Sequence, residues 1–396
     1  MAISRRQVLL GGAGALGAMA SLPRPALAQS EPIRIGWLAA MTGPSSAPAI
    51  GFDRGVHFAA DEINAAGGVN GRKIEIITRD TQGDPTKAVN ATQEMISQLK
   101  VDGVWGPTNS GESLAVTPIM ARAKMPNLHP CVIDSLIDPV KFPNAFRLAP
   151  SNTQWDDAVR NYCLNILKVK KVAVIGDTTG YGVTAANASV AGFKKDGADV
   201  VYQANIDATQ PDMAPDMLRA KNAGAEVIVS WSTSTGMDAR LFNTRATMGW
   251  DVPFVGHPSM SSGEIGKLVA KPADWDDVYA VGYKSCSYDA AGKLPAHSQE
   301  LIDKMRGKVE LSDTLLWWVA GGYDAITLFG KAIGANGTDS QGIISYLNGL
   351  DKYPGYFGTY TYTETQHNGY PTSEVVMSAA STARNGTFAL APGYSS

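Results

Sequence analysis

The chain contains few of the residues that mark metal or redox centres. It has three cysteines and five histidines in 396 residues, with no CxxC pair and no H-E-x-x-H motif among them. Three cysteines allow one disulfide at most, and we expect Cys131, Cys163 and Cys286 to be buried free thiols, although a bridge between two of them stays open. We therefore expect no metal site and no bound cofactor.

Positive charge and long apolar runs are also scarce. The formal net charge is −3 at pH 7, and it becomes −6 if Arg5, Arg6 and Arg24 leave with an N-terminal segment. This balance argues against nucleic acid or an anionic membrane surface as a partner. No stretch beyond the N-terminus approaches the roughly 18 consecutive apolar residues that a membrane-spanning helix needs.

Signatures of common enzymes are missing as well. No G-x-S-x-G follows an expected strand, and no G-x-x-x-x-G-K-[ST] loop occurs, which disfavours a serine hydrolase and a nucleotide triphosphatase. The single G-x-G-x-x-G, residues 12–17, precedes every expected strand, so it lacks the context that dinucleotide binding requires. We do not expect an enzyme.

The N-terminus carries the features of an export signal. Arg5 and Arg6 precede the uncharged residues 8–22, and Ala26-Leu27-Ala28 supplies the small residues that a signal peptidase accepts. We expect residues 1–28 to be a signal peptide cleaved after Ala28, which places the mature protein in the periplasm. The paired arginines resemble a twin-arginine signal, while Val8 leaves the general secretory route open.

Strands and helices alternate along the rest of the chain. The alternation indicates an α/β protein whose mostly parallel sheets are covered by helices on both faces. Expected strands are 33–38, 73–77, 101–106, 126–130, 171–176, 199–206, 226–231, 253–255, 356–362 and 374–379. Expected helices are 51–66, 84–99, 111–123, 152–167, 182–196, 212–223, 236–248, 296–306, 313–335 and 339–349.

The pattern restarts near residue 150, which predicts two doubly wound, Rossmann-like lobes. We assign residues 29–148 plus 286–356 to the first lobe and residues 149–285 plus 357–396 to the second. The C-terminal residues thus complete both lobes, and the candidate crossings are 146–150, 279–285 and 356–361. No low-complexity linker separates the lobes, which favours a hinged pair.

Small polar residues gather where expected strands end and helices begin. Ligands of open α/β sheets bind at this edge, and helix N-termini there favour a carboxylate. The same residues are also ordinary helix caps. His257 at a strand end and Trp318 on an apolar helix are further candidates. The strand-end candidates are Thr42, Ser45, Asn109, Ser110, Gly111, Tyr181, Ser234 and Thr235.

Several motifs resemble the leucine/isoleucine/valine-type (type I) periplasmic binding proteins of ABC importers. They are Met41-Thr42-Gly43-Pro44, the run from Asp61 to Gly71, Asp80-Thr81-Gln82-Gly83-Asp84-Pro85, Val104-Trp105-Gly106-Pro107 and Gly180-Tyr181-Gly182. The resemblance implies two lobes joined by three crossovers, which close on a small ligand and deliver it to a membrane permease. It also implies a protein without catalysis, which we expect to be a monomer.

The resemblance also implies where a ligand would bind. The family's ligand loops fall on Ser110 and Gly111, on residues 131–133, which include Cys131 and Ile133, and on Tyr181, Ser234 or Thr235, and His257. Trp318 stands where amino-acid binders have an aromatic residue that contacts the ligand side chain.

Two positions depart from the amino-acid-binding pattern. Ile133 stands where a hydroxyl is usual, and Pro258 stands near the usual acidic partner of an α-ammonium group. A buried ammonium without a carboxylate is costly, so we expect a small carboxylate or amide ligand, compatible with an aromatic body. A branched-chain amino acid stays open, because Glu112 or Asp134 could replace the acid. A ligand sensor of the same fold and an exported serine hydrolase are the remaining alternatives.

Overall fold

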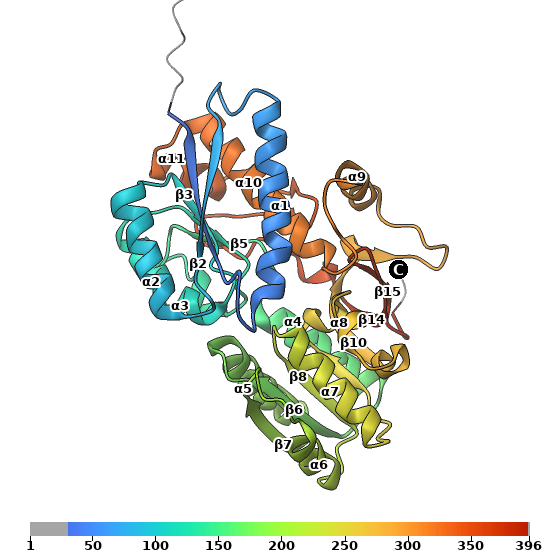
Figure 1. Ribbon diagram of the computed structural model, residues 1–396. Coiled ribbons are helices and arrows are strands. Elements are labelled where there is room, and N and C mark those ends of the chain that lie inside the picture. The colour runs from blue at the N-terminus through green and yellow to red at the C-terminus, as the bar shows by residue number, and fades with distance from the viewer. Residues whose placement is uncertain (1–30, 395–396) are drawn as a thin grey trace, which may run out of the picture.

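The computed structural model describes residues 31–394, so the expected signal peptide lies outside the described residues. Two α/β lobes lie one above the other in Figure 1. The first contains a five-stranded sheet in the order β2-β1-β3-β4-β5. Its strands, all parallel, are β1 (Ile33–Ala39), β2 (Ile74–Asp80), β3 (Gly103–Trp105), β4 (Asn127–His129) and β5 (Ala145–Arg147).

Helices cover both faces of this sheet. Alternate residues of β1 point to opposite faces, as a strand requires. Ile35 and Trp37 join the core beneath α1 and α10, whereas Leu38 packs with residues of α2 and α3. The helices are α1 (Ser46–Ala65), α2 (Pro85–Glu94), α3 (Ser110–Arg122), α10 (Leu316–Asn336) and α11 (Ser340–Asn348).

The second lobe contains an eight-stranded sheet in the order β11-β15-β14-β10-β9-β8-β6-β7. It is parallel from β7 to β10, and β14 then pairs antiparallel with β10. The strands are β6 (Lys171–Asp177), β7 (Asp199–Ile206), β8 (Val227–Trp231), β9 (Phe254–Gly256), β10 (Val278–Tyr283), β11 (Ser287–Tyr288), β14 (Val375–Arg384) and β15 (Thr387–Leu390).

Helices again cover both faces of the second sheet. Val172 and Val174 share a core with residues of α4 and α5, while Ala173 and Ile175 pack with residues of α6 and α7. The helices are α4 (Asn152–Asn161), α5 (Gly180–Lys195), α6 (Ala214–Asn222), α7 (Thr235–Thr247) and the short α8 (Ile265–Leu268). The predicted fold class, two doubly wound lobes, is confirmed.

The chain passes between the lobes three times. It crosses after β5, then between β11 and α10 in a passage that carries α9 (Ala296–Met305), and finally between the hairpin β12 (Tyr353–Pro354) and β13 (Thr359–Tyr360) and strand β14. The second and third crossings begin later than expected. Thr359 and Tyr360 of β13 still pair with β12, before the third crossing begins. Tyr279 lies inside β10, and Ser287 and Tyr288 still pair with β15. A two-residue edge strand has no pattern by which the sequence could reveal it.

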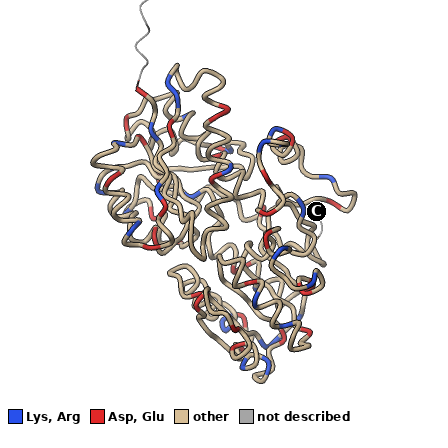
Figure 2. The backbone as a smooth tube through the Cα atoms, viewed as in Figure 1, with Lys and Arg blue, Asp and Glu red and all other residues tan. Residues whose placement is uncertain are grey.

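Basic and acidic residues are interspersed along the backbone of both lobes (Figure 2). No helix within residues 31–394 is long and apolar enough to cross a bilayer. All three cysteines are free and buried, as expected from the sequence.

Candidate functional site

The candidate site lies between the lobes, where strand ends and helix N-termini of both sheets meet. Its cavity is about 30 Å³, room for about one water molecule. The walls come from α1, α3, α4, α5, α10 and the four loops that follow β3, β4, β8 and β9. The lining residues are Pro48, Phe52, Thr108, Asn109, Ser110, Pro130, Cys131, Val132, Trp155, Tyr181, Thr233, His257, Trp317 and Trp318.

The first-lobe wall is the N-terminus of α3 and the loop after β4. Asn109 caps α3, and its Oδ1 accepts a hydrogen bond from Gly111 N at 2.8 Å. This leaves Ser110 buried in the first turn, where the positive end of the helix dipole favours an anion. Cys131 donates to Pro107 O and accepts from Ser113 Oγ, each at 3.0 Å, and burial raises the pKa of its thiol to about 12.

Aromatic rings form the second-lobe wall. The rings of Trp155 and Tyr181 each lie with their centroids 5.3 Å from that of His257. Burial lowers the pKa of His257 to about 3, so its imidazole is neutral. Its Nδ1 accepts a hydrogen bond from Ser259 N at 3.1 Å, which places the proton on Nε2. His257, which lines the cavity, thus carries its ring proton on Nε2.

The start of α10 forms the floor of the cavity. The ring centroid of Trp317 lies 5.5 Å from that of Phe52 and 6.3 Å from that of Trp155, so it touches both walls. Trp318 adjoins it, at 5.8 Å. The pairs meet edge to face or tilted, an arrangement that aromatic quadrupoles favour. The floor is therefore an apolar surface on which a planar or branched group can rest.

Four hydrogen-bond donors in this lining have no partner. They are Asn109 Nδ2, Trp155 Nε1, Tyr181 OH and Trp317 Nε1, all fully buried. The phenol of Tyr181 stays protonated because burial holds its pKa well above the usual value. No Asp or Glu side chain of residues 31–394 lines this cavity. The lining residues therefore carry unpartnered donors and no carboxylate. Asp177, whose Oδ2 accepts from Thr233 N at 3.3 Å, lies behind the lining.

Glu112 and Asp134, the two acids expected to be able to pair with a ligand ammonium group, do not line the cavity. Glu112 is completely buried in the first turn of α3 but does not line the cavity, and burial raises the pKa of its carboxyl to about 7. Asp134 accepts from Arg147 Nη2 at 3.3 Å and from Thr153 Oγ1 at 2.6 Å. Neither carboxylate reaches the lining.

The structure brings together half of the twelve residues that the sequence nominated. Asn109, Ser110, Cys131, Tyr181, His257 and Trp318 line the cavity.

The other six nominated residues do not line the cavity. Thr42 donates to Asp80 Oδ2 at 2.7 Å, Thr235 donates to Glu264, and Ser234 caps α7. Ile133 packs with Leu136. Ser45 and Gly111 lie where the lobes touch.

These contacts show that the lobes are closed on one another. Ser45 Oγ lies 3.1 Å from Thr233 Oγ1 of the opposite lobe. Gly111 and Gly180 meet at the N-termini of α3 and α5, and a Cβ atom on Gly180 would lie only 2.9 Å from Gly111 Cα. Small residues are required at this contact.

The sequence analysis did not nominate Trp155, Trp317, Phe52 or Thr233. Trp155 lies on α4 directly after the first crossing, and the only available signal was its position beside an expected hinge. Thr233 stands among several consecutive Ser and Thr residues in the loop before α7, and the sequence gives no reason to prefer it over its neighbours. Their roles depend on how the lobes pack, which local patterns do not encode.

A larger hollow of about 650 Å³ lies elsewhere, between α1 and α9. Three of its charged lining residues, Arg54, Glu62 and Lys304, already form ion pairs within the protein. Lys304 lies 3.2 Å from Glu62, and Arg54 lies 2.6 Å from Asp313. We therefore regard the smaller interlobe cavity, with its unpartnered donors, as the candidate site.

Two α/β lobes closed over a donor-lined cleft define a solute-binding protein. Residues 32–382 match the model of the periplasmic binding protein family, and the chain belongs to this family, in its type I, leucine/isoleucine/valine-binding form. The members of this family bind solutes and are not enzymes.

Individual relatives agree with this assignment. The chain is 29% identical over 196 residues to Leu/Ile/Val-binding protein homolog 3 of Brucella melitensis, a match covering 50% of this chain and 53% of that protein. It thus spans about half the length of that curated relative.

Two solved structures share the fold. The branched-chain amino acid binding protein LivJ of Streptococcus pneumoniae, in complex with isoleucine, has a TM-score of 0.77 at 22% identity and covers 90% of this chain and 97% of its own. A solute-binding protein of an ABC transporter from Rhodopseudomonas palustris, in complex with 3,4-dihydroxybenzoic acid, has a TM-score of 0.72 at 20% identity and covers 87% and 92%.

Proposed function

We propose that this protein is the extracytoplasmic substrate-binding component of an ABC importer of the branched-chain amino acid type. It captures a small carboxylate or amide that lacks an α-ammonium group and delivers it to a membrane permease. Family membership supports the binding role. The first lobe would comprise residues 29–148 and the segment between the second and third crossings, and the second lobe would comprise the rest of the mature chain.

The observation that carries the ligand class is the set of four unpartnered donors in a cavity without a carboxylate. A buried donor left without an acceptor costs about 1–3 kcal/mol, so an acceptor-rich ligand relieves several such costs together. A buried ammonium group would find no counter-charge in this lining. The site therefore matches carboxylate or amide oxygens and disfavours an α-amino acid.

Helix electrostatics favour the same class. The N-termini of α3 and α5 approach one another across the cleft at Gly111 and Gly180. Both helix ends carry partial positive charge, so their approach is unfavourable unless negative charge lies near them. A ligand carboxylate beside Ser110 would supply that charge.

The apolar floor is suited to an aromatic or branched group. Trp155, Trp317 and Trp318 supply the contact surface. The related proteins named above bind isoleucine in one case and 3,4-dihydroxybenzoic acid in the other. The second ligand lacks an ammonium group, as we propose for this chain, whereas the first represents the alternative, a branched-chain amino acid.

Competition titration tests the ligand class. Leucine and phenylalanine are compared with their deaminated analogues, 4-methylpentanoate and 3-phenylpropanoate, at pH 7.5. We expect the deaminated acids to bind more tightly. If either amino acid binds more than tenfold tighter than its analogue, a difference of about 1.4 kcal/mol, the proposed ligand class is wrong.

The remaining parts of the proposal concern location and partners. We propose that the signal peptide is cleaved after Ala28 and that the mature protein works in the periplasm as a monomer. Mass spectrometry of the secreted protein should give a chain that begins at Gln29. An intact N-terminus on the exported protein would contradict the proposed cleavage.

A further inference from the structure

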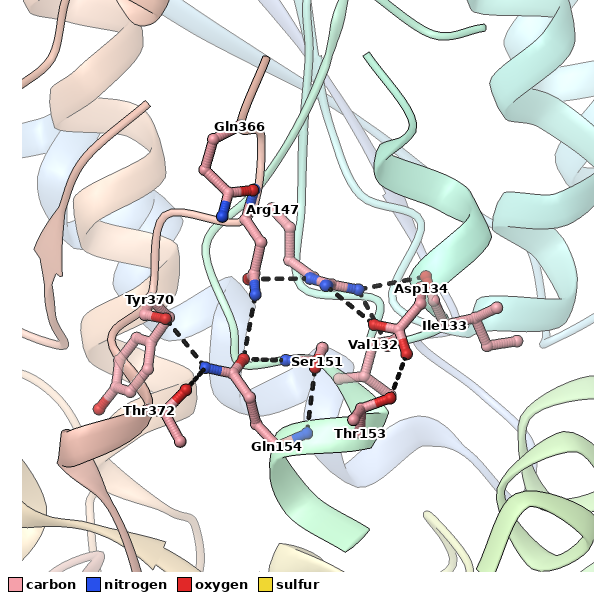
Figure 3. Close-up of polar contacts among 11 residues, drawn as sticks. Val132, Ile133, Asp134, Arg147, Ser151, Thr153, Gln154, Gln366, Tyr370 and Thr372 are labelled. Carbon is pink, nitrogen blue, oxygen red and sulfur yellow. Dashed lines mark hydrogen bonds and ion pairs between the residues drawn. The ribbon is translucent and has the colours of Figure 1, made fainter. Parts of the chain in front are cut away.

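Arg147, the last residue of β5, is a buried cation at the junction of the lobes (Figure 3). Its side chain is only 1% exposed. Nη1 donates to Val132 O at 2.9 Å and to Ile133 O at 3.1 Å. Val132 lines the cavity, so the guanidinium lies directly behind a loop that forms the cleft.

The same arginine is tied to two of the interlobe crossings. Its Nε donates to Asn368 Oδ1 at 3.2 Å, and Asn368 Nδ2 donates to Gln154 Oε1 at 3.1 Å. Gln154 in turn donates to Tyr370 O at 3.1 Å and to Thr372 Oγ1 at 2.8 Å. Figure 3 shows this continuous network, which joins the first crossing, the third crossing and the ligand loop.

The charge of Arg147 is only partly balanced. The carboxylate that contacts it, Asp134, lies 3.3 Å away with 51% of its side chain exposed, so water screens that ion pair from one side. Burial lowers the pKa of Arg147 to about 10, and the group remains a cation at neutral pH. The other titratable groups that face it, the imidazole of His129, the thiol of Cys131 and the phenol of Tyr362, are neutral, because burial lowers the pKa of the imidazole and raises those of the thiol and the phenol. A buried charge in this setting favours an anion nearby.

We propose that Arg147 is the residue that makes the cleft prefer a carboxylate over the matching amide. It is a positioning residue: it acts through the loop at residues 131–133, which it holds by two carbonyl groups, and through its positive field at the cavity wall. The inference rests on the proposed function and narrows it, because that function admits both acids and amides.

The test measures a ratio, the Kd of an amide divided by the Kd of its acid. The probes are 3-phenylpropanoate with 3-phenylpropanamide, and 4-methylpentanoate with 4-methylpentanamide, titrated by calorimetry at pH 7.5. Arg147→Gln removes the charge, whereas Arg147→Lys keeps the charge and loses the planar fork. Arg245→Gln is the matched control, because Arg245 is a buried arginine that donates to three backbone carbonyls within the second lobe.

We expect Arg147→Gln to lower the ratio at least tenfold and Arg147→Lys to keep most of it while weakening both probes. Arg245→Gln should leave the ratio within twofold of the natural protein. A purely structural role would weaken acid and amide equally, so an unchanged ratio in Arg147→Gln overturns the inference.

If Arg147→Gln does not fold, a second variant tests whether the charge of Arg147 sets the preference for acid over amide. Asp134→Asn removes the half-exposed counter-charge, and the ratio should then rise at least threefold. Asp138→Asn, a carboxylate in the same loop that contacts Lys141, is its control and should change the ratio less than twofold. An unchanged or lower ratio in Asp134→Asn overturns the inference.

The natural protein separates this inference from the proposed function. If it binds acid and amide equally well, the role of Arg147 is wrong while the proposed function stands. If it binds neither member of either pair, the proposed ligand class is wrong, and the inference is wrong with it.

Discussion

Single residues set the chemistry of the cleft by the hydrogen bonds that they leave unmade. Asn109 uses its carbonyl oxygen to cap α3 and leaves its amide Nδ2 without a partner. His257 uses Nδ1 to hold Ser259 N and so directs its proton to Nε2. In both cases a local structural bond fixes which polar atom remains for a ligand. The donors are thus oriented before any ligand arrives, which lowers the entropic cost of binding.

Ser110 provides the most direct test of the anion-binding wall. Ser110→Ala should weaken binding of 3-phenylpropanoate by about 1–3 kcal/mol, the cost of losing one charge-assisted hydrogen bond. Ser97→Ala is the control, because its hydroxyl donates to Gln93 O at 2.7 Å and neither residue lines the cavity. Unaltered affinity in calorimetry would exclude Ser110 from contact with the ligand.

Glu112 should make stability depend on pH. Burial raises the pKa of its carboxyl from 4.5 to about 7, so the folded state holds a proton that the unfolded state releases. Its contribution is therefore fully present below pH 4.5 and is lost as the pH rises through 7. Relative to Glu112→Gln, the natural protein should lose about 3 kcal/mol of unfolding free energy between pH 4 and pH 8.

Urea denaturation of both proteins at several pH values measures this difference. Glu94→Gln serves as the control, since Glu94 is only partly buried, with 34% of its side chain exposed, and pairs with Arg79. Parallel pH profiles for the natural protein and Glu112→Gln would show that Glu112 is ionised at little cost in the folded state.

Residues of the site could be predicted from the sequence only where they follow an expected strand or begin an expected helix. Ser110 follows a strand and opens a helix, and His257 follows a strand, so position alone nominated both. Trp155 gave no such signal, because a tryptophan on an amphipathic helix has the same pattern whether it faces a core or a cleft. Thr42 was nominated by the same rule as Ser110, yet its hydroxyl binds Asp80.

At the scale of elements, the long helices and buried strands were predictable, whereas short edge strands were not. Helix α10 was expected at 313–335 and spans Leu316–Asn336, because its apolar face is long and continuous. The strand β5 was expected as part of a crossing, and β11 has only two residues. These segments are strands because a neighbouring strand pairs with them. Their own sequences carry little β preference, so tertiary context decides.

The contact between the N-termini of α3 and α5 leads to a prediction about closure of the two lobes. Gly180→Ala places a Cβ atom 2.9 Å from Gly111 Cα, closer than backbone atoms tolerate, so the lobes should close incompletely. Affinity for 3-phenylpropanoate should fall at least tenfold while the unfolding free energy changes little, since alanine suits a helix.

Gly334→Ala is the matched control for this substitution. It lies in α10, and its added Cβ atom would meet only Val69 Cγ1 at 3.4 Å, an ordinary contact. Gly334→Ala should keep full affinity. Equal affinities for the two variants would show that the contact between Gly111 and Gly180 does not limit closure.

At the scale of the whole molecule, one core runs through both lobes. Trp37 and Trp105 of the first sheet stack, Phe52 and Trp317 continue the contacts to the cleft floor, and Tyr283 at the end of β10 meets Trp317 at 5.2 Å. The part of the core that the two lobes share lies at the crossings. The far side of the cleft is held by small contacts such as Ser45 with Thr233, which can break without exposing a core. The geometry therefore favours hinge motion about the crossings.

Hinge motion is required by the size of the cavity. About 30 Å³ admits no ligand as large as leucine or 3-phenylpropanoate, so the lobes must separate for entry and close again around a somewhat larger volume. Small-angle scattering should give a larger radius of gyration for the protein alone than for the protein saturated with the tightest-binding acid of the titration. Gly180→Ala should show less compaction at saturation. The same radius with and without ligand would contradict closure about the crossings, and the loops of the cleft alone would then have to admit the ligand.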